Sequence, residues 1–305
     1  MSEYSIGVDL GGTNLRAAAV SREGEMLHKV AGSTARGSGR EEIIANMVSA
    51  IETIRGGLPE HTLQGIGVGI PGIILMEKGM LVAAPNLPEL VNYPVRDEVG
   101  RRLGTRVILE NDANAAALGE KWMGAGRDVQ DLILFTLGTG VGGGIVLGGK
   151  VHHGYLGMAG ELGHMTVVPN GHPCGCGSVG CLEQYASASA IVGMAKALAL
   201  GHDLSAQDVF NLAQSGNVRA RQIFDTVGNA LGVAIGSLIN VFNAPLYVLG
   251  GGVAAGWDQF APAMMEEVGR RSFIHRAQPA RIEKAVLGGD AGLFGAASLG
   301  FAGGV

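Results

Sequence analysis

Short apolar runs separated by glycine-rich turns alternate along the chain with longer amphipathic stretches, and this pattern predicts a mixed α/β fold. The expected strands are 4–10, 15–20, 26–30, 64–70, 105–110, 132–137, 144–147 and 246–249. The expected helices are one with apolar residues at helical spacing from Ile43 to Ile54, an alanine-rich one over 113–122, and three more over 183–200, 205–214 and 217–241.

One unit of this pattern occurs twice. A strand runs into glycine and threonine and a second strand follows, first at Gly11-Gly12-Thr13 and again at Gly138-Thr139-Gly140. A chain of 305 residues also exceeds the size at which a single core usually stops growing. We therefore expect two related lobes that each present one such hairpin.

The segment from Thr226 to Trp257 contains no charged residue and resembles a membrane span in hydropathy. It also contains three asparagines, Pro245 and the glycine run 250–252. Because polar groups without partners are costly in hydrocarbon, a buried helix followed by a core strand is the better interpretation. No membrane partner is expected.

Composition narrows the class of protein further. Apolar residues make up 47% and charged residues 16%, which excludes an intrinsically disordered chain. The net charge of −5 offers no basic face for nucleic acid. Glycine is unusually common, with 52 residues and no collagen-like period, so these glycines are expected to serve backbone geometry. The first four residues lack the cationic start of a signal peptide, and a cytoplasmic location is expected.

The two glycine hairpins are candidate phosphate sites. Glycine lets a ligand approach consecutive backbone N–H groups, so Gly11, Gly12, Thr13 and Asn14 in one hairpin and Gly138 and Thr139 in the other suit a polyphosphate such as ATP. Asp9 ends the first strand, where it could hold Mg²⁺ through water. A further glycine loop at Gly251 and Gly252 would suit an adenosine. The plain alternatives are tight turns and close helix–strand packing.

The three cysteines fall within eight residues, at Cys174, Cys176 and Cys181. With His164 they form a Cys3His set that is appropriate for structural Zn²⁺. His172 competes for the fourth position, and free thiols or a catalytic cysteine are the alternatives without metal.

Asn111 and Asp112 lie where an expected strand ends and a helix begins. Such a pair can orient a sugar hydroxyl, with the aspartate accepting its proton. The alternative is that Asp112 caps the helix.

In this order the motifs resemble the ROK family of sugar kinases and repressors, within the actin-like ATPase superfamily. The resemblance spans nearly the whole chain. It rests on the segments 9–14, 109–115 and 137–142, and above all on Gly160-Glu161-Leu162-Gly163-His164 followed by the cysteine cluster and Leu182-Glu183-Gln184-Tyr185. Within the family the cysteine segment is most similar to that of bacterial glucokinases.

The resemblance implies roles for individual residues. Asp112 would be the catalytic base that accepts the proton of the sugar's C6 hydroxyl. The residues implied to contact the sugar are Gly72, Asn111, Asp112, Gly140, Glu161, His164 and Glu183. Gly72 and Gly140 would do so by their backbone, and His164 would also bind zinc.

The fold implied is a pair of actin-like, ribonuclease H-like lobes with a cleft between them and a small zinc knuckle over 164–181. The N-terminal lobe would comprise 1–118 and the C-terminal helix at about 290–305, and the second lobe 119–289. The activity implied is ATP-dependent phosphorylation of glucose at O6, which yields glucose 6-phosphate and ADP. Two alternatives stay open. The acceptor could instead be fructose, mannose, N-acetylglucosamine or N-acetylmannosamine, and the donor could be polyphosphate.

A sugar-sensing regulator without catalysis is the alternative from another class, although the few residues before Tyr4 leave no room for the DNA-binding module that such proteins carry. Homo-oligomers, dimers or tetramers, are expected from the resemblance.

Overall fold

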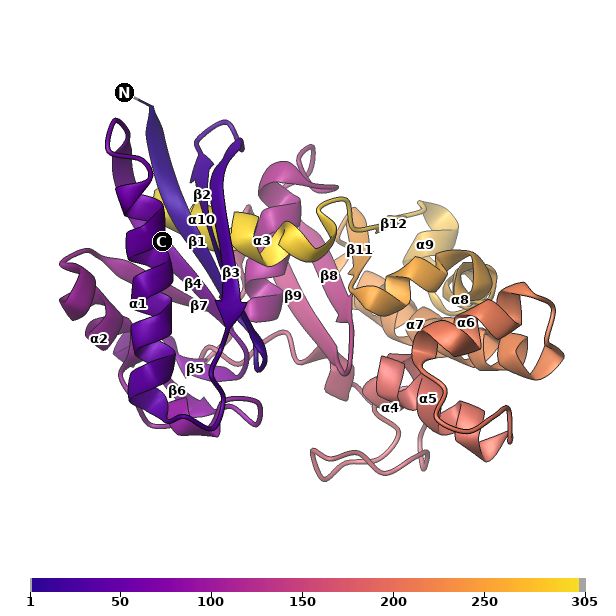
Figure 1. The fold of residues 1–305 in the computed structure, drawn as a ribbon. Helices are drawn as coiled ribbons and strands as arrows, with labels where there is room; N and C mark the ends of the chain where they lie inside the picture. Colours follow the sequence, from indigo (N-terminus) through magenta and orange to yellow (C-terminus); the bar gives the residue numbers. More distant parts are fainter. Residues whose placement is uncertain (1, 302–305) are drawn as a thin grey trace. The chain divides into compact units, whose positions relative to one another are not determined.

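A computed structural model describes residues 2–301 of the chain, and within them the fold is α/β with two five-stranded mixed sheets (Figure 1). Two compact units can be distinguished. The first comprises Met1–Gln130, Gly144–Gly160 and Val286–Val305, and the second comprises Asp131–Gly143 and Glu161–Ala285. Residues 1 and 302–305, which the expected N-terminal lobe includes, lie outside the described part.

The first sheet has the strand order β3-β2-β1-β4-β7. Its strands are β1 (Glu3–Leu10), β2 (Asn14–Ser21), β3 (Met26–Ser33), β4 (Thr62–Ile70) and β7 (Val107–Asn111). The first three are antiparallel neighbours, whereas β1, β4 and β7 run parallel.

The second sheet repeats this order as β10-β9-β8-β11-β12. Its strands are β8 (Leu132–Leu137), β9 (Val141–Leu147), β10 (Lys150–Val151), β11 (Leu246–Gly250) and β12 (Arg281–Lys284). Here β8, β11 and β12 are the parallel strands. Identical strand order in both sheets confirms the prediction of two related lobes that was made from the repeated hairpin pattern.

Ten helices occur in the described residues, and seven of them fall in the expected ranges, whereas those over 95–103, 257–271 and 273–277 were not predicted. The ten helices are α1 (Arg40–Gly56), α2 (Val95–Leu103), α3 (Asp112–Met123), α4 (Glu183–Ala186), α5 (Ala188–Ala197), α6 (Ala206–Gln214), α7 (Val218–Phe242), α8 (Trp257–Arg271), α9 (Phe273–Ala277) and α10 (Ala291–Phe301). Short elements add the pair β5 (Ile73–Leu75) and β6 (Met80–Ala83) and the 3₁₀ turns η1 (Met76–Lys78), η2 (Pro88–Leu90), η3 (Leu162–His164), η4 (Gly252–Gly256) and η5 (Gly288–Asp290).

The predicted helix 183–200 is divided into α4 and α5. Ser187 is extended, and its side chain accepts a hydrogen bond from the backbone N–H of Ala190. A serine that caps the next helix competes with continuation of the previous one, so the helix restarts at this point.

Helix α7 confirms the interpretation of the uncharged segment as core. It is long and apolar enough to span a membrane, but 67% of its most apolar window is buried inside the fold. Strand β11, which follows it, is buried at every position.

Both faces of the first sheet are covered, and they differ in side-chain size. One face presents Ile6, Val8 and Leu10 to α1, in a large apolar core. On the other face the backbone of α10 comes so close to Gly7 of β1 and to Gly65 and Gly67 of β4 that a Cβ at these positions would meet its carbonyl oxygens. The glycines of β1 and β4 therefore allow α10 to pack closely against this face of the sheet.

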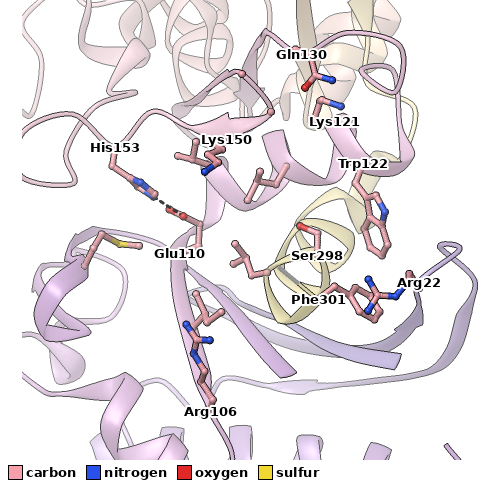
Figure 2. A pocket seen from close by; sticks show the side chains of 17 residues that line it. Arg22, Arg106, Glu110, Lys121, Trp122, Gln130, Lys150, His153, Ser298 and Phe301 are labelled. Atoms are coloured by element: carbon pink, nitrogen blue, oxygen red, sulfur yellow. Dashed lines mark hydrogen bonds and ion pairs between the residues drawn. The ribbon is translucent and has the colours of Figure 1, made fainter. Parts of the chain in front are cut away.

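Helix α10 also packs tightly against α3. A Cβ on Gly119 of α3 would overlap the carbonyl of Ala291, and Gly295 makes the reciprocal approach to Ala115. At the far end, Trp122 of α3 and Phe301 of α10 meet edge to face at 5.7 Å (Figure 2).

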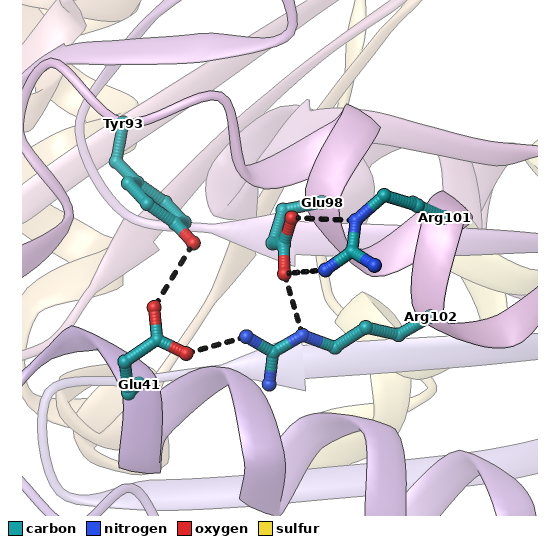
Figure 3. A network of polar contacts seen from close by, with 5 residues as sticks. All are labelled: Glu41, Tyr93, Glu98, Arg101 and Arg102. Atoms are coloured by element: carbon teal, nitrogen blue, oxygen red, sulfur yellow. Dashed lines mark hydrogen bonds and ion pairs between the residues drawn. The ribbon is translucent and has the colours of Figure 1, made fainter.

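Helix α2 is joined to α1 by a polar network (Figure 3). Glu98 forms ion pairs with Arg101 and Arg102 of its own helix. Arg102 also forms an ion pair with Glu41 of α1, at 2.5 Å. Tyr93 donates its hydroxyl to Glu41 at 3.4 Å. The two arginines lower the pKa of Glu98 to about 2, so this carboxylate stays charged at any physiological pH.

The close packing of α3 and α10 can be tested with Gly119→Ala. The added methyl group must displace backbone, so we expect a loss of about 1–3 kcal/mol in the free energy of unfolding, measured by denaturant titration. Gly193→Ala in α5 is the matched control, because open space surrounds that position. It should be neutral or stabilise by up to about 1 kcal/mol. Equal effects of the two substitutions would contradict the packing argument.

Candidate functional site

The junction between β7 and α3 holds the expected catalytic residue. The Asn111 side chain caps α3, accepting hydrogen bonds from the backbone N–H groups of Ala113 at 2.9 Å and Asn114 at 3.2 Å. Asp112 is the exposed first residue of the helix. The alternative that Asp112 is the cap is therefore wrong, because its neighbour performs that task.

Asn111 also fixes the loop that carries Gly72. Its side-chain amide donates a hydrogen bond to the Gly72 carbonyl at 3.2 Å. Three of the expected sugar contacts, Gly72, Asn111 and Asp112, thus lie together in the first unit.

Glu110, the residue before this pair, is a positioning group that sequence reasoning did not single out. Its buried carboxylate accepts from the Asn111 backbone N–H at 2.9 Å and from the Asn114 side chain at 3.0 Å, and it contacts His153 at 2.7 Å. The hydrogen bond that His153 makes to the Glu110 carboxylate raises the pKa of His153, while partial burial opposes this shift. The only signal in the sequence was a carboxylate in an otherwise apolar strand.

The first glycine hairpin joins β1 to β2. It is closed by a hydrogen bond from the Gly11 N–H to the Asn14 carbonyl at 2.8 Å, and the Thr34 hydroxyl donates to the Gly11 carbonyl at 2.7 Å. Gly12 lies against Asn86, so a side chain would be crowded there. Thr13 and Asn14 are exposed.

Asp9, at the base of this hairpin, is paired with Arg16, which also lies 3.7 Å from Asp290. Sequence reasoning missed Arg16, although its place opposite Asp9 follows from the antiparallel register. An ionised carboxylate has several acceptor positions, so the pairing leaves Asp9 able to accept from a magnesium-bound water.

The second hairpin, between β8 and β9, lies on the start of α5. The Gly138 carbonyl accepts from the Ala188 N–H and the Thr139 carbonyl from the Ser189 hydroxyl, each at 2.8 Å. Gly251, at the end of β11, lies against the backbone of Leu137.

A pocket of about 360 Å³ opens beside this hairpin, within the second unit. Gly138, Thr139 and Gly252 line it, together with the rings of Phe210 and Phe224. A lining that combines backbone groups of glycine with apolar side chains suits a phosphorylated nucleoside. The structure therefore joins three expected nucleotide contacts in a single pocket.

Gly140 and Glu183 are in direct contact in the second unit. The Glu183 carboxylate accepts a hydrogen bond from the Val141 backbone N–H at 2.9 Å, and a Cβ on Gly140 would collide with the same oxygen. Only glycine at position 140 lets Glu183 hold the start of β9.

The Cys3His set is assembled as expected. The ligand atoms of His164, Cys174, Cys176 and Cys181 all lie within 4.8 Å of one another. The Cys176 and Cys181 sulfurs are 3.7 Å apart, and the Cys174 sulfur is 3.7 Å from His164 Nδ1. A tetrahedral zinc with bonds of about 2.3 Å would place its sulfur ligands about 3.8 Å apart. The residues thus fit a zinc ion.

The thiols differ in their surroundings. Burial raises the pKa of Cys181 to about 11, whereas a backbone hydrogen bond from Ser178 lowers that of Cys176. A buried thiol that resists ionisation binds a metal only because the cation replaces its proton.

His164, not His172, completes the set. His164 turns Nδ1 toward Cys174, while its Nε2 lies 4.0 Å from the Glu161 carboxylate. His172 stacks on Tyr185 with ring centroids 5.4 Å apart, and its backbone N–H donates to the Tyr185 hydroxyl. The second ring nitrogen of His164 therefore stays on the side of Glu161.

The expected site residues form two groups. The first unit holds Asp9, Gly11, Gly12, Thr13, Asn14, Gly72, Asn111 and Asp112. The second unit holds Gly138, Thr139, Gly140, Glu161, His164, Cys174, Cys176, Cys181, Glu183, Gly251 and Gly252.

Comparison with known proteins relates the whole chain to one family. The model of the ROK family matches residues 5–301. A glucokinase of Halalkalibacterium halodurans is 38% identical over 308 residues, which cover 96% of this chain and 93% of that protein. The xylose repressor of Caldicellulosiruptor bescii is 31% identical and covers 92% of this chain and 74% of that protein.

Among solved structures, a ROK family glucokinase from Streptomyces griseus, in complex with glucose and AMPPNP, is 35% identical. It superimposes with a TM-score of 0.81, covering 97% of this chain and 98% of that one.

The zinc site can be tested by elemental analysis. We expect about one zinc per chain, and its removal by a chelator should lower the melting temperature, because the metal holds an otherwise loosely structured loop. Cys176→Ser should lose most of the zinc, whereas Ser178→Ala in the same loop should keep it. A metal-free protein with an unchanged melting temperature would exclude the site.

Proposed function

Because the chain belongs to the ROK family, we propose that it is a sugar kinase that transfers the γ-phosphoryl group of ATP to O6 of glucose. The products are glucose 6-phosphate and ADP. The observation that carries the proposal is the β7–α3 junction, where Asn111 takes over the helix cap and Asp112 lies exposed at the first position of the helix.

In this reaction Asp112 orients the C6 hydroxyl and accepts its proton as the oxygen attacks phosphorus. Phosphoryl transfer through a loose transition state depends mainly on alignment and charge neutralisation, so one well-placed carboxylate is sufficient as base. Glu110 supports this alignment, because it anchors Asn111 on one side of Asp112 and Asn114 on the other.

The remaining sugar hydroxyls are bound by Asn111, Glu161, His164 and Glu183, with backbone contacts from Gly72 and Gly140. Two of these assignments are supported by local geometry. His164 directs Nδ1 to the cysteines, which leaves Nε2 for a hydroxyl, and Glu183 binds the backbone with Oε2 alone. Zinc, when bound, contributes structure by fixing the His164 ring.

ATP is bound by backbone amides, in keeping with the acidic net charge of −5. Gly138, Thr139 and Gly252 line the pocket that would take the nucleoside. In the first hairpin the Gly11 N–H is bound to the Asn14 carbonyl, so the phosphates would bind the N–H groups that follow it, from Gly12 onward. Magnesium, when bound, neutralises phosphate charge, and Asp9 is the residue of the first hairpin that would hold it.

Another hexose as acceptor and polyphosphate as donor are alternatives within the same class. A sugar-sensing regulator is the alternative outside it, and the similarity to a xylose repressor is the observation in its favour. The charge balance argues against it, since DNA binding requires a basic face.

Asp112→Asn tests the catalytic assignment. The amide still forms a hydrogen bond but cannot accept a proton, so kcat should fall by about 10²- to 10⁴-fold while KM for glucose changes much less. Asp97→Asn, which alters an exposed aspartate of α2 in the same unit, is the control and should be nearly wild type. Near-normal turnover of Asp112→Asn would remove this residue from its role.

The acceptor and donor are tested by coupled ADP release with glucose, fructose, mannose, N-acetylglucosamine and N-acetylmannosamine, and by glucose 6-phosphate formation with polyphosphate in place of ATP. We expect kcat/KM for glucose with ATP to exceed every other combination by at least about tenfold. A preference for another sugar would correct the substrate while keeping the activity. Absence of turnover with all sugars, together with specific retardation of duplex DNA in a gel, would favour the regulator.

A further inference from the structure

A second pocket, of about 620 Å³, lies within the first unit and contains none of the residues proposed to bind sugar or ATP (Figure 2). It lies among β7, α3, the β9–β10 hairpin and the end of α10. Its volume falls within the range of small-molecule sites.

The charged groups that line this pocket are mostly cationic. Arg22, Arg106, Lys121 and Lys150 surround it, against the single carboxylate of Glu110. Arg22 is paired with Glu3 at 2.9 Å and lies over the Phe301 ring at 4.9 Å. The side-chain amines of Lys121 and Lys150 form no hydrogen bond or ion pair with any residue from 2 to 301. Two unpaired lysines at one cavity of an acidic protein indicate a site for an anion.

The rest of the lining is apolar and aromatic. Trp122 and Phe301 present rings to the pocket, and Ile108 and Leu118 add aliphatic surface. A bare inorganic ion would leave this surface unused. The lining suits a molecule that carries an acidic group and a ring.

The pocket also reaches the anchor of the catalytic segment. Glu110 and His153 both line it, and they contact each other at 2.7 Å (Figure 2). The other oxygen of Glu110 accepts from Asn111 and Asn114, on either side of Asp112. A change in the contact between His153 and Glu110 would therefore act on the same carboxylate that binds Asn111 and Asn114.

We propose that this pocket is a regulatory site for a small organic anion that has an aromatic or other apolar ring. The acidic group binds Lys121 and Lys150, and the ring packs on Trp122. Occupancy strengthens the His153–Glu110 contact, because a nearby anion favours the protonated imidazole. The segment from Asn111 to Asn114 is thereby held more firmly, and turnover rises.

Binding is tested with 1-naphthyl phosphate by calorimetry on the full chain, with ADP present to fill the nucleotide pocket. We expect saturable binding that weakens with added salt, and at least about tenfold weaker binding of uncharged 1-naphthol. The double variant Lys121→Gln/Lys150→Gln should lose at least about tenfold in affinity and keep its basal activity. Lys196→Gln, an exposed lysine of α5, is the control and should bind like wild type. No binding up to about 10 mM, or binding indifferent to the two lysines, would overturn the site.

Transmission to Asp112 rests on the proposed kinase function and is tested separately. Saturating 1-naphthyl phosphate should raise kcat at least about twofold with KM for sugar little changed, and His153→Gln should bind the probe without this response. If the probe binds without any change in kcat, the proposed effect on Asp112 is wrong, whereas the proposed binding site still stands. If the chain phosphorylates no sugar, the proposed function fails while the binding result stands.

Discussion

The close approach of α10 to its neighbours is the constraint on which the first unit depends. Its backbone lies directly against glycines of β1, β4 and α3, where no side chain fits. Since α3 begins with Asp112 and packs along α10, a segment near the end of the chain fixes the helix that carries the proposed base. Six glycines of the described residues have this packing use: Gly7, Gly65, Gly67, Gly119, Gly295 and Gly300. Part of the glycine excess therefore serves the contacts of α10, apart from the hairpins proposed for phosphate.

Features that depend on local chemistry could be predicted from the sequence. The strands, the repeated strand–glycine–strand unit and the Cys3His set follow from spacing alone, because each is formed by residues close in the chain. Features that depend on contacts between residues far apart in the chain could not be predicted in this way. His153 is 43 residues from its partner Glu110, and the short strands β10 and β12 exist only as edges of a sheet whose longer members are predictable.

The β7–α3 junction shows the same limit on a smaller scale. Asparagine and aspartate are both good caps, so the sequence Asn-Asp does not reveal which of them ends the strand. The choice is made by Gly72, whose carbonyl binds the Asn111 amide and turns the carbonyl oxygen of that side chain toward the helix. Asp112 then becomes the first helical residue, where the positive end of the helix favours a carboxylate.

The two proposed sites would bind negatively charged groups in different ways. In the hairpins proposed for ATP, backbone N–H groups supply the donors, and these carry no net charge and need no counterion when the ligand leaves. In the second pocket, lysine side chains supply positive charge at the end of flexible chains, next to a histidine that is itself held by a buried carboxylate. A rigid binding site made of uncharged backbone groups suits a substrate that must be aligned and released at every turnover. A flexible charged site next to a titratable pair suits a ligand that only needs to be sensed.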